Sequence, residues 1–476
     1  MVESKIRPSR RSFLLGVGAT GLLSALPINS GRAGSDGVVK LSSKPTQFDI
    51  LAGAGPITDV WAYNGRVPGP ELRVRQGERL RVRFENGIPQ ESTVHWHGMR
   101  IPNAMDGVPG LTQKPVPSGG AFDYEFTPPD AGTYWYHPHV KSSEQLGRGL
   151  YGPLIIEEAE PPKVDRDVTW VIDDWRIDQN GAIDESFHDM HDMSHSGRLG
   201  NVAALNGVSS DTFSVRAGER IRLRLINVAN ARVFALNFAD HEPVVIALDG
   251  HPVDPFAPAN GRIVLASGQR ADLILDMSGK PGQVTPVVDN YYSRSTYKFL
   301  DLVYDNKQPI REIPLDAPVR LPSNPLAEPS MADAKPMALS ISGGAMGGMR
   351  EARFKGKSMG IRELVGLGKV WAINGEVFDP TSGAPMFTVK KGSTQRLVIS
   401  NETSWPHPMH LHGHAFKIIA RNGKKAEREI WTDTVFLDPD EQVEALFVAD
   451  NPGDWLFHCH ILEHHEAGMA TVVRVS

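Results

Sequence analysis

The sequence is poor in cysteine, in long apolar runs and in positive charge. Its 476 residues include a single cysteine, Cys459, which excludes an internal disulfide. This thiol is therefore a packing residue, a reactive group or a metal ligand. Beyond the N-terminal segment, no stretch has the roughly 18 unbroken apolar residues that a membrane-spanning helix needs. We therefore expect no stable membrane anchor in the body of the chain.

Positive charge is also in short supply. The formal net charge is −6, and it becomes −10 without residues 1–33, which hold five basic residues and one acidic residue. Nucleic-acid binding depends on clustered positive charge, so a nucleic-acid partner is excluded. The negative balance is compatible with a cationic substrate, although net charge bears first on solubility.

Residues 1–35 have the pattern of an export signal. Four basic residues come first: Lys5, Arg7, Arg10 and Arg11. An apolar stretch over 13–26 follows, and small residues lead to Ala33, after which we expect cleavage. The paired arginines of the run SRRSFL are typical of twin-arginine signals. A membrane anchor is the alternative, but the apolar stretch is short and rich in glycine. We predict export to the periplasm by the twin-arginine machinery.

A recurring pattern divides the rest of the chain into three parts. Asn-Gly pairs begin at Asn64, Asn206 and Asn374, each followed by a Gly-containing turn and a further Asn. The pairs are 142 and 168 residues apart, so each part is a domain and not a solenoid repeat. Between these points, apolar residues alternate as in short, half-buried strands, and prolines are frequent. We predict an all-β chain of β-sandwiches. The domains are expected at 40–160, 161–310 and 335–476.

Histidines occur in four His-x-His pairs. They are His95/His97, His137/His139, His410/His412 and His458/His460. Residues two apart on a strand point to the same face, so each pair can present two imidazoles to one cavity. The first and third parts hold two pairs each, whereas the second offers Phe234–Phe238 instead. One pair alone proves little. Eight imidazoles with few carboxylates suit several metal ions at a domain interface, and copper is favoured.

The cysteine lies between the last two of these histidines. If its neighbours face the shared cavity, Cys459 faces the opposite side of the strand. There it can join His407 and His464, with Met469 as a weak axial ligand. Thiolate, imidazole and thioether together are the ligands of a blue-copper electron-transfer site. The two metal sites would then be joined through one strand.

These motifs resemble the four copper motifs of the multicopper oxidases, which include laccases and bacterial cuprous oxidases. The resemblance spans the whole mature chain. The matching runs are His95-Trp-His-Gly, His137-Pro-His, His407-Pro-x-His-x-His-Gly and His458-Cys-His-x3-His464-x4-Met469. The resemblance implies three cupredoxin-like Greek-key β-sandwich domains and four copper ions. It implies a type 1 copper on His407, Cys459, His464 and Met469. It also implies a type 2 copper on His95 and His410, and a type 3 pair on His97, His137, His139, His412, His458 and His460.

The implied activity is a laccase-like oxidase. A small donor, such as a phenol, an aryl amine or cuprous ion, would lose one electron at a time, and electrons passing through Cys459 would reduce dioxygen to water. Asp106 and Glu463 resemble acids that supply the protons, against the alternative of solvated loop carboxylates. Asp433 resembles a position near the type 1 site that hydrogen-bonds a ligand imidazole or a substrate. The alternative is a purely structural role for Asp433 in a turn.

Three other functions remain open at this point. One is a cuprous oxidase dedicated to copper tolerance, and another is a copper-binding protein without turnover. A nitrite-reducing copper enzyme is the third, although such enzymes lack the His-Cys-His pattern. Two groups of soft ligands could bind substrate copper: the run His188–His195, and Met346, Met349 and Met359. The long methionine-rich insert of the bacterial cuprous oxidases is missing, which weakens the cuprous assignment.

Overall fold

A computed structural model describes residues 31–32, 37–313, 315–316 and 320–476. The predicted export signal lies outside these residues, except for Gly31–Arg32. Within the described ranges, no helix combines the length and the apolar character needed to cross a bilayer. Strands dominate and helices are short, which confirms the predicted all-β fold.

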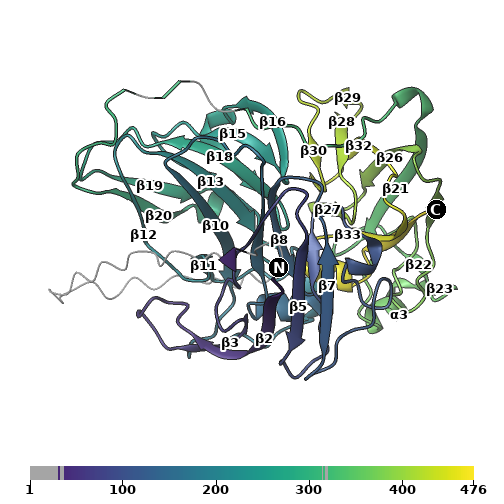
Figure 1. The fold of residues 1–476 in the computed structure, drawn as a ribbon. Helices are drawn as coiled ribbons and strands as arrows, with labels where there is room; N and C mark the ends of the chain where they lie inside the picture. Colours follow the sequence, from purple (N-terminus) through teal and green to yellow (C-terminus); the bar gives the residue numbers. More distant parts are fainter. Residues whose placement is uncertain (1–30, 33–36, 314, 317–319) are drawn as a thin grey trace.

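The first β-unit consists of two sheets built from residues 31–157 (Figure 1). One sheet has the order β1 (Gly31–Arg32), β4 (Leu72–Arg75), β9 (Gly152–Glu157), β8 (Gly132–His137), β6 (His95–His97). The other has the order β3 (Thr58–Tyr63), β2 (Val39–Phe48), β5 (Leu80–Asn86), β7 (Ala121–Phe126). Buried side chains from both sheets form one core, so the unit is a sandwich.

The second β-unit is built in the same way from residues 166–304. Its first sheet has the order β11 (Val202–Leu205), β10 (Arg166–Trp175), β13 (Arg220–Asn227), β18 (Arg270–Asp276), β15 (Val244–Leu248), β16 (His251–Phe256). Its second sheet has the order β12 (Thr212–Val215), β20 (Tyr297–Tyr304), β19 (Val284–Asp289), β14 (Phe234–Asn237), β17 (Arg262–Leu265).

The third β-unit spans residues 335–475 and holds two larger sheets and a hairpin. One sheet has the order β24 (Trp371–Ile373), β21 (Lys335–Gly343), β26 (Thr394–Asn401), β32 (Gln442–Val448), β28 (Phe416–Arg421), β29 (Lys424–Lys425), and β30 (Trp431–Thr432) also pairs with β28. The other has the order β25 (Phe387–Val389), β34 (Ala470–Val475), β33 (Gly453–Cys459), β27 (His407–Leu411), β31 (Thr434–Leu437). The hairpin joins β22 (Glu351–Phe354) to β23 (Lys357–Gly360).

The helices are short and lie between strands. They are α1 (Ser142–Gly147), α2 (Met190–Ser194), α3 (Ile361–Gly366) and α4 (Leu462–Glu466), with single 3-10 turns at Asn103–Met105, Ala259–Gly261, Ser293–Ser295 and Met331–Asp333. Both α1 and α2 contact α4, which directly follows β33. Segments from all three β-units therefore meet at the end of the strand that carries Cys459.

Strand β13 shows how the units are joined. The sequence predicts a half-buried strand here, but every residue of β13 is buried. One face contributes apolar residues to the core of the second unit. The other carries Arg222, which pairs at 2.6 Å with Glu158 directly after β9, and Arg224, which donates to the Thr133 hydroxyl of β8 at 2.9 Å. Because this arginine face packs against the first unit, the prediction of solvent exposure is wrong.

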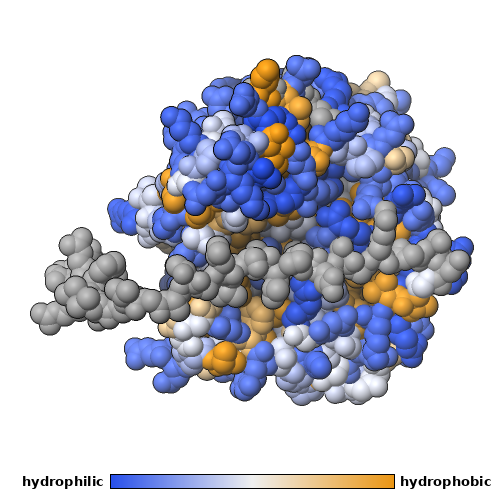
Figure 2. Space-filling model, turned by 60° about the vertical axis from the view of Figure 1, so that its left-hand side comes forward, coloured by the Kyte–Doolittle hydropathy of each residue, from blue (hydrophilic) through white to orange (hydrophobic). Residues whose placement is uncertain are grey.

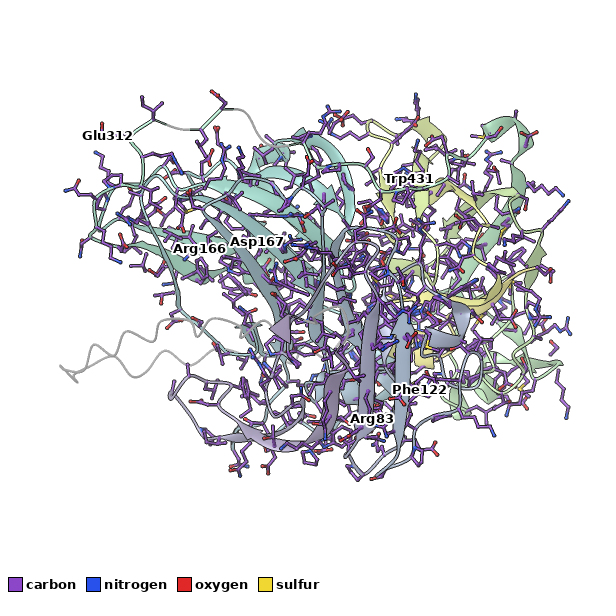
Figure 3. All side chains as sticks on the ribbon, viewed as in Figure 1. Arg83, Phe122, Arg166, Asp167, Glu312 and Trp431 are labelled. Carbon is purple, nitrogen blue, oxygen red and sulfur yellow. The ribbon has the colours of Figure 1, made fainter. Side chains whose placement is uncertain are left out.

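The face of the molecule that Figure 2 shows is mostly hydrophilic. In the face of Figure 2, hydrophobic residues are scattered among hydrophilic ones. Figure 3 shows side chains filling the space between the units, with Phe122 on the first, Asp167 on the second and Trp431 on the third. The domain limits expected from the sequence remain our proposal.

Candidate copper centres

The predicted metal ligands come together in two buried groups. The larger one, here called the histidine cluster, contains all four His-x-His pairs. Two strand pairs position it. In the first unit β6 pairs with β8, placing His95 opposite His137, and in the third unit β27 pairs with β33, placing His410 opposite His458. His97 follows in β6 from the two-residue repeat of a strand, whereas the second histidines of the other pairs lie just past the ends of β8, β27 and β33.

Histidines of the first and third units interleave in this cluster. The ring of His95 stacks on that of His412 with centroids 3.9 Å apart, and His97 stacks on His410 at the same separation. Ligand atoms of His95, His410 and His412 lie within 4.8 Å of one another, as do those of the triad His139, His412 and His458. The cluster therefore lies at the interface between two units, as the sequence predicts.

The ring nitrogens fit metal binding. The Nδ1 atoms of His95, His410 and His460 donate to the backbone oxygen of Asp106 at 2.8 Å, the backbone oxygen of Asp433 at 2.9 Å and the Ser267 hydroxyl at 2.9 Å. The Nε2 atom of each of these three rings is buried and has no hydrogen-bond partner among the described residues. Buried polar atoms are normally paired, so these free nitrogens suit metal coordination.

Burial also sets the protonation of the rings. It lowers the pKa of His137, His139 and His458 well below the usual value, and neighbouring imidazoles lower it further. Neutral imidazole has the free lone pair that a metal ion requires. The donor set and its charge state therefore fit copper.

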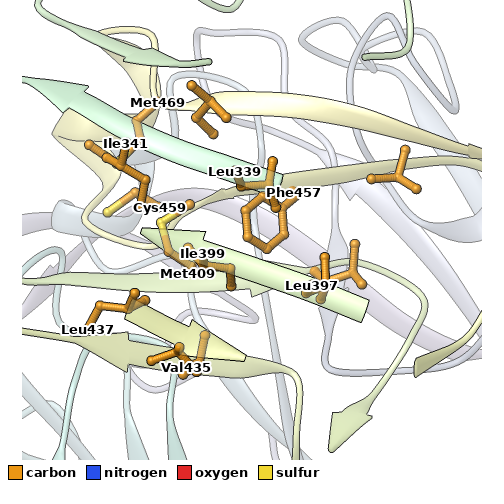
Figure 4. Close-up of a cluster of buried hydrophobic side chains, with 14 of the residues drawn as sticks. Leu339, Ile341, Leu397, Ile399, Met409, Val435, Leu437, Phe457, Cys459 and Met469 are labelled. Atoms are coloured by element: carbon orange, nitrogen blue, oxygen red, sulfur yellow. The ribbon is translucent and has the colours of Figure 1, made fainter. Parts of the chain in front are cut away.

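The smaller group, here called the cysteine site, contains His407, Cys459, His464 and Met469. The Cys459 sulfur lies 3.6 Å from His407 Nδ1 and 3.8 Å from His464 Nδ1. The backbone N–H of Cys459 donates to the Met469 carbonyl at 3.1 Å, and all four residues are fully buried. Figure 4 shows Cys459 and Met469 among the apolar side chains of the third unit's core.

The surroundings of the cysteine site also suit a metal ion. Burial raises the pKa of the Cys459 thiol, so a thiolate there requires a neighbouring cation such as a bound metal. The outer nitrogen of each histidine already has a protein partner. His407 Nε2 lies 2.9 Å from the Thr403 hydroxyl, and His464 Nε2 donates to the His195 carbonyl at 2.8 Å. Both rings therefore present Nδ1 to the sulfur.

Two of the three predicted acids contact the histidine cluster. Asp106 Oδ2 accepts from His412 Nδ1 at 2.9 Å. Asp433 lies against His410 and His97, with its Oδ1 atom 3.2 Å from His410 Nδ1 and 3.3 Å from His97 Nε2. Asp433 therefore has the predicted contact with ligand imidazoles, but it lies at the histidine cluster and not near the cysteine site as expected. It follows β30 and precedes β31, and the latter pairs with the His410 end of β27.

Glu463 lies at the junction of the units. Its carboxylate accepts from Asn230 Nδ2 at 2.9 Å and from the backbone N–H of Arg198 at 3.1 Å. Burial raises its pKa despite these hydrogen bonds. A carboxyl group of this kind keeps its proton to a higher pH than an exposed glutamate does.

Comparisons with known proteins agree with this geometry. Sequence models of the multicopper oxidase family match residues 46–161, 166–307 and 353–476. A solved multi-copper oxidase from Pseudomonas thermotolerans is 33% identical over 92% of this chain and 99% of its own, with a TM-score of 0.80. The chain belongs to the multicopper oxidase family. It is thus an oxidoreductase that uses dioxygen and four copper ions: one type 1, one type 2 and a type 3 pair.

Two curated relatives extend over nearly the full length. Multicopper oxidase MmcO of Mycobacterium tuberculosis is 29% identical, with 98% of this chain and 96% of the relative covered. Copper resistance protein A of Pseudomonas syringae pv. tomato is 26% identical, with 98% and 99% covered. The predicted three cupredoxin-like sandwiches agree with these matches.

Several contacts at the two sites were not predicted from the sequence. Ser267 and Arg270 of the second unit reach the histidine cluster, although that unit has no His-x-His pair. The second unit also covers the cysteine site through the carbonyl of His195. These partners lie far away in the chain, and no local motif marks them.

Proposed function

We propose that the protein oxidises a donor one electron at a time at the cysteine site and passes the electrons to the histidine cluster. Copper bound at the two sites would supply the redox chemistry, taking up single electrons and delivering four to dioxygen to give water. The supporting observation is strand β33, which ends with His458 and Cys459 and is followed directly by His460. Its side chains reach both ligand groups, so the route between them is one residue long.

The ligand assignment is part of this proposal. Type 1 copper would be held by His407, Cys459, His464 and Met469. Type 2 copper would be held by His95 and His410. The type 3 pair would be held by His97, His137, His139, His412, His458 and His460. We assign the protons to Asp106 and Glu463, since both are buried acids beside ligand segments. Export through the twin-arginine route to the periplasm stays part of the proposal.

The residues that cover the cysteine site limit which electron donors can reach its ligands. Residues 188–195, here called the α2 cap, place the His195 carbonyl on His464. His464 is fully buried, so a donor meets the cap and not the ligand ring itself. Bulky phenols gain no direct contact with the type 1 ligands. This arrangement favours a small donor.

The cap also carries soft ligands. The rings of His191 and His195 stack with centroids 4.0 Å apart, and His195 packs on Trp405. The Ala345 N–H donates to the Ser194 carbonyl at 2.7 Å, which brings the adjacent Met346 to the cap. Met346 is 77% exposed. Imidazole and thioether both suit cuprous ion.

The other two predicted methionines take a different role. Met349 and Met359 pack against a small apolar core formed by Phe354, Leu364 and their neighbours. They are partly buried there, whereas Met346 is exposed. Cuprous ion is therefore favoured as the donor because the cap histidines and Met346 suit it. Phenols and aryl amines are expected to be slower donors. The relative named copper resistance protein A is consistent with this choice.

Oxygen uptake by the copper-loaded protein tests the proposal. Cuprous ion and a dimethoxyphenol are offered in parallel to the wild type and to the double variant His191→Gln, Met346→Leu. We expect faster uptake with cuprous ion, and a loss in the double variant that is confined to this donor. Fast phenol turnover that exceeds cuprous turnover would reject the cuprous assignment. Uptake with neither donor, at full copper loading, would reject the oxidase and leave a binding protein.

A further inference from the structure

The turn between β17 and β18, residues 266–270, reaches from the second unit into the histidine cluster. The second unit supplies none of the proposed ligands, yet Ser267 and Gly268 lie against His460, and Arg270 pairs with Asp433, which lies beside His97 and His410. We infer that this turn is a positioning element for the histidine cluster, fixing the orientation of His460 and of the Asp433 carboxylate. The inference rests on the proposed ligand assignment.

Ser267 controls one ligand ring. Its hydroxyl lies 2.9 Å from His460 Nδ1 and 2.5 Å from the Ala229 carbonyl. A hydroxyl has one proton, so when it donates to Ala229 it accepts from the Nδ1–H of His460. That hydrogen bond selects the tautomer in which His460 Nε2 is free. This Nε2 atom has no protein partner within the described part of the chain.

Arg270 fixes the orientation of the Asp433 carboxylate. Its guanidinium forms a bidentate pair with Asp433, with Nη1 2.9 Å from Oδ1 and Nη2 2.6 Å from Oδ2. A planar guanidinium fixes both carboxylate oxygens at once, which a lysine does not do. Asp433 Oδ1 then lies 3.3 Å from His97 Nε2, so this ring keeps Nδ1 free. The Asp433 carboxylate and the Thr434 hydroxyl, each 3.3 Å from His97 Nε2, together determine which nitrogen His97 presents. Asp433 Oδ1 also lies 3.2 Å from Nδ1 of His410, a proposed type 2 ligand.

The local sequence allows the turn to come this close. Gly268 has φ +87°, and a Cβ atom there would lie 2.9 Å from the His460 ring. Gly98, directly after His97, has φ +83°, and a Cβ atom there would lie 2.3 Å from Arg270 Nη2. A side chain at either position would push the turn away from the cluster. Both glycines therefore allow the turn to lie close to the histidine cluster.

Contacts with all three units also hold Arg270 and the neighbouring Gln269 in place. Arg270 Nε donates to the Thr133 carbonyl of the first unit at 3.1 Å, and Nη1 lies 3.4 Å from Asp249. Gln269 Nε2 donates to the Thr434 carbonyl of the third unit at 2.9 Å. The turn is therefore anchored in all three units, and the cluster is complete only when the three are assembled.

The test compares Ser267→Ala and Arg270→Met with Arg222→Met. Arg222 is equally buried and also pairs with carboxylates, but it contacts none of the proposed ligands. The readouts are copper bound per chain under chelator competition, the type 2 EPR signal, the type 3 near-ultraviolet band and the melting temperature without copper. We expect Ser267→Ala and Arg270→Met to weaken cluster copper on the order of 10–100-fold while the blue type 1 band stays. Arg270→Lys should restore the charge but not the type 2 signal.

Several outcomes would overturn the inference. One is unchanged type 2 and type 3 signals in both Ser267→Ala and Arg270→Met. Another is loss of cluster copper in Arg222→Met at an equal drop in melting temperature, which would indicate general destabilisation. A wild type that binds copper without type 2 and type 3 signals would overturn the ligand assignment itself. That result differs from the first two because it appears before any substitution is made.

Discussion

The two ligand groups are built in different ways. The cysteine site takes all its proposed ligands from residues 407–469 of one β-unit, and its sulfur lies in that unit's own core. The histidine cluster interleaves rings from two units and is backed by a turn from the third. A site of the first kind forms with its own domain, whereas one of the second kind depends on the docking of domains. Changes at unit interfaces should therefore affect the histidine cluster first.

The largest effect should come from removing the thiolate that links the cysteine site to the histidine cluster. Cys459→Ser removes the only thiolate, so the blue absorption should vanish and oxidase activity should fall to background. This loss should exceed the roughly 10–100-fold cost of losing an outer hydrogen-bond partner. Metal analysis and EPR should still find copper in the histidine cluster. Persisting donor oxidation would contradict the role of Cys459 as the entry route.

Asp106→Asn should damage the histidine cluster alone. The carboxylate accepts from His412 Nδ1, and an amide of equal size weakens that hydrogen bond. We expect oxygen uptake to fall roughly 10–100-fold while the blue band keeps its intensity. Steady-state oxygen consumption and absorption spectra of the same sample give both values. A matched loss of the blue band would mean that the two groups are not separable.

Trp371→Phe should act on the cysteine site and its cap. The indole N–H donates to the Met193 carbonyl at 2.7 Å, and the ring lies 4.4 Å from that of His464. Loss of this hydrogen bond should cost about 1 kcal/mol of stability and loosen the α2 cap. We expect phenol turnover to rise relative to cuprous turnover, with cluster EPR signals unchanged. Equal changes for both donors would argue against the cap as a filter.

The smallest effect concerns the pair that ties the cap to α4. His188 Nδ1 lies 3.1 Å from Glu466 Oε2, and this hydrogen bond raises the pKa of His188 above 6.5. Burial opposes the charge on Glu466, but the His188 and Ser143 hydrogen bonds lower its pKa below 4.5. The stability from His188 is thus complete below pH 6.5 and lost as pH rises through its folded pKa. The stability that Glu466 contributes is present above pH 4.5 and is lost as pH falls through the folded pKa of Glu466.

The pair should therefore contribute most between these two values. His188→Gln should lower the melting temperature near pH 5.5 and much less at pH 8.5. Because His188 is partly exposed, we expect at most about 0.5 kcal/mol. A difference that grows toward alkaline pH would contradict the ion pair.

The contrast between the groups also explains what the sequence could predict. The two-residue repeat of a strand placed His458 and His460 on one side and Cys459 on the other, because alternation is a local property. The Asn-Gly repeat predicted three sandwiches for the same reason. Contacts of Ser267 with His460 and of Arg270 with Asp433 span 193 and 163 residues. They depend on which faces of the units meet, and no local pattern encodes this.

The misplacement of Asp433 has the same physical cause. The resemblance of the run around Asp433 implied a place near the cysteine site, but β31 pairs along β27 and carries Asp433 toward His410. The buried face of β13 was missed because Arg222 pairs with Glu158, directly after β9, and Arg224 donates to the Thr133 hydroxyl of the first unit. Charged residues are normally read as solvent-exposed, and only the docked partner reverses this.

The most direct test of the account is the stoichiometry of oxygen reduction. An oxygen electrode and a peroxide assay, run with a counted amount of cuprous ion, measure the donor electrons consumed per dioxygen. Coupling of the cysteine site to a complete histidine cluster predicts four electrons per dioxygen, with no peroxide released. Two electrons per dioxygen with peroxide accumulating would contradict it, because the donor would then be oxidised without the cluster.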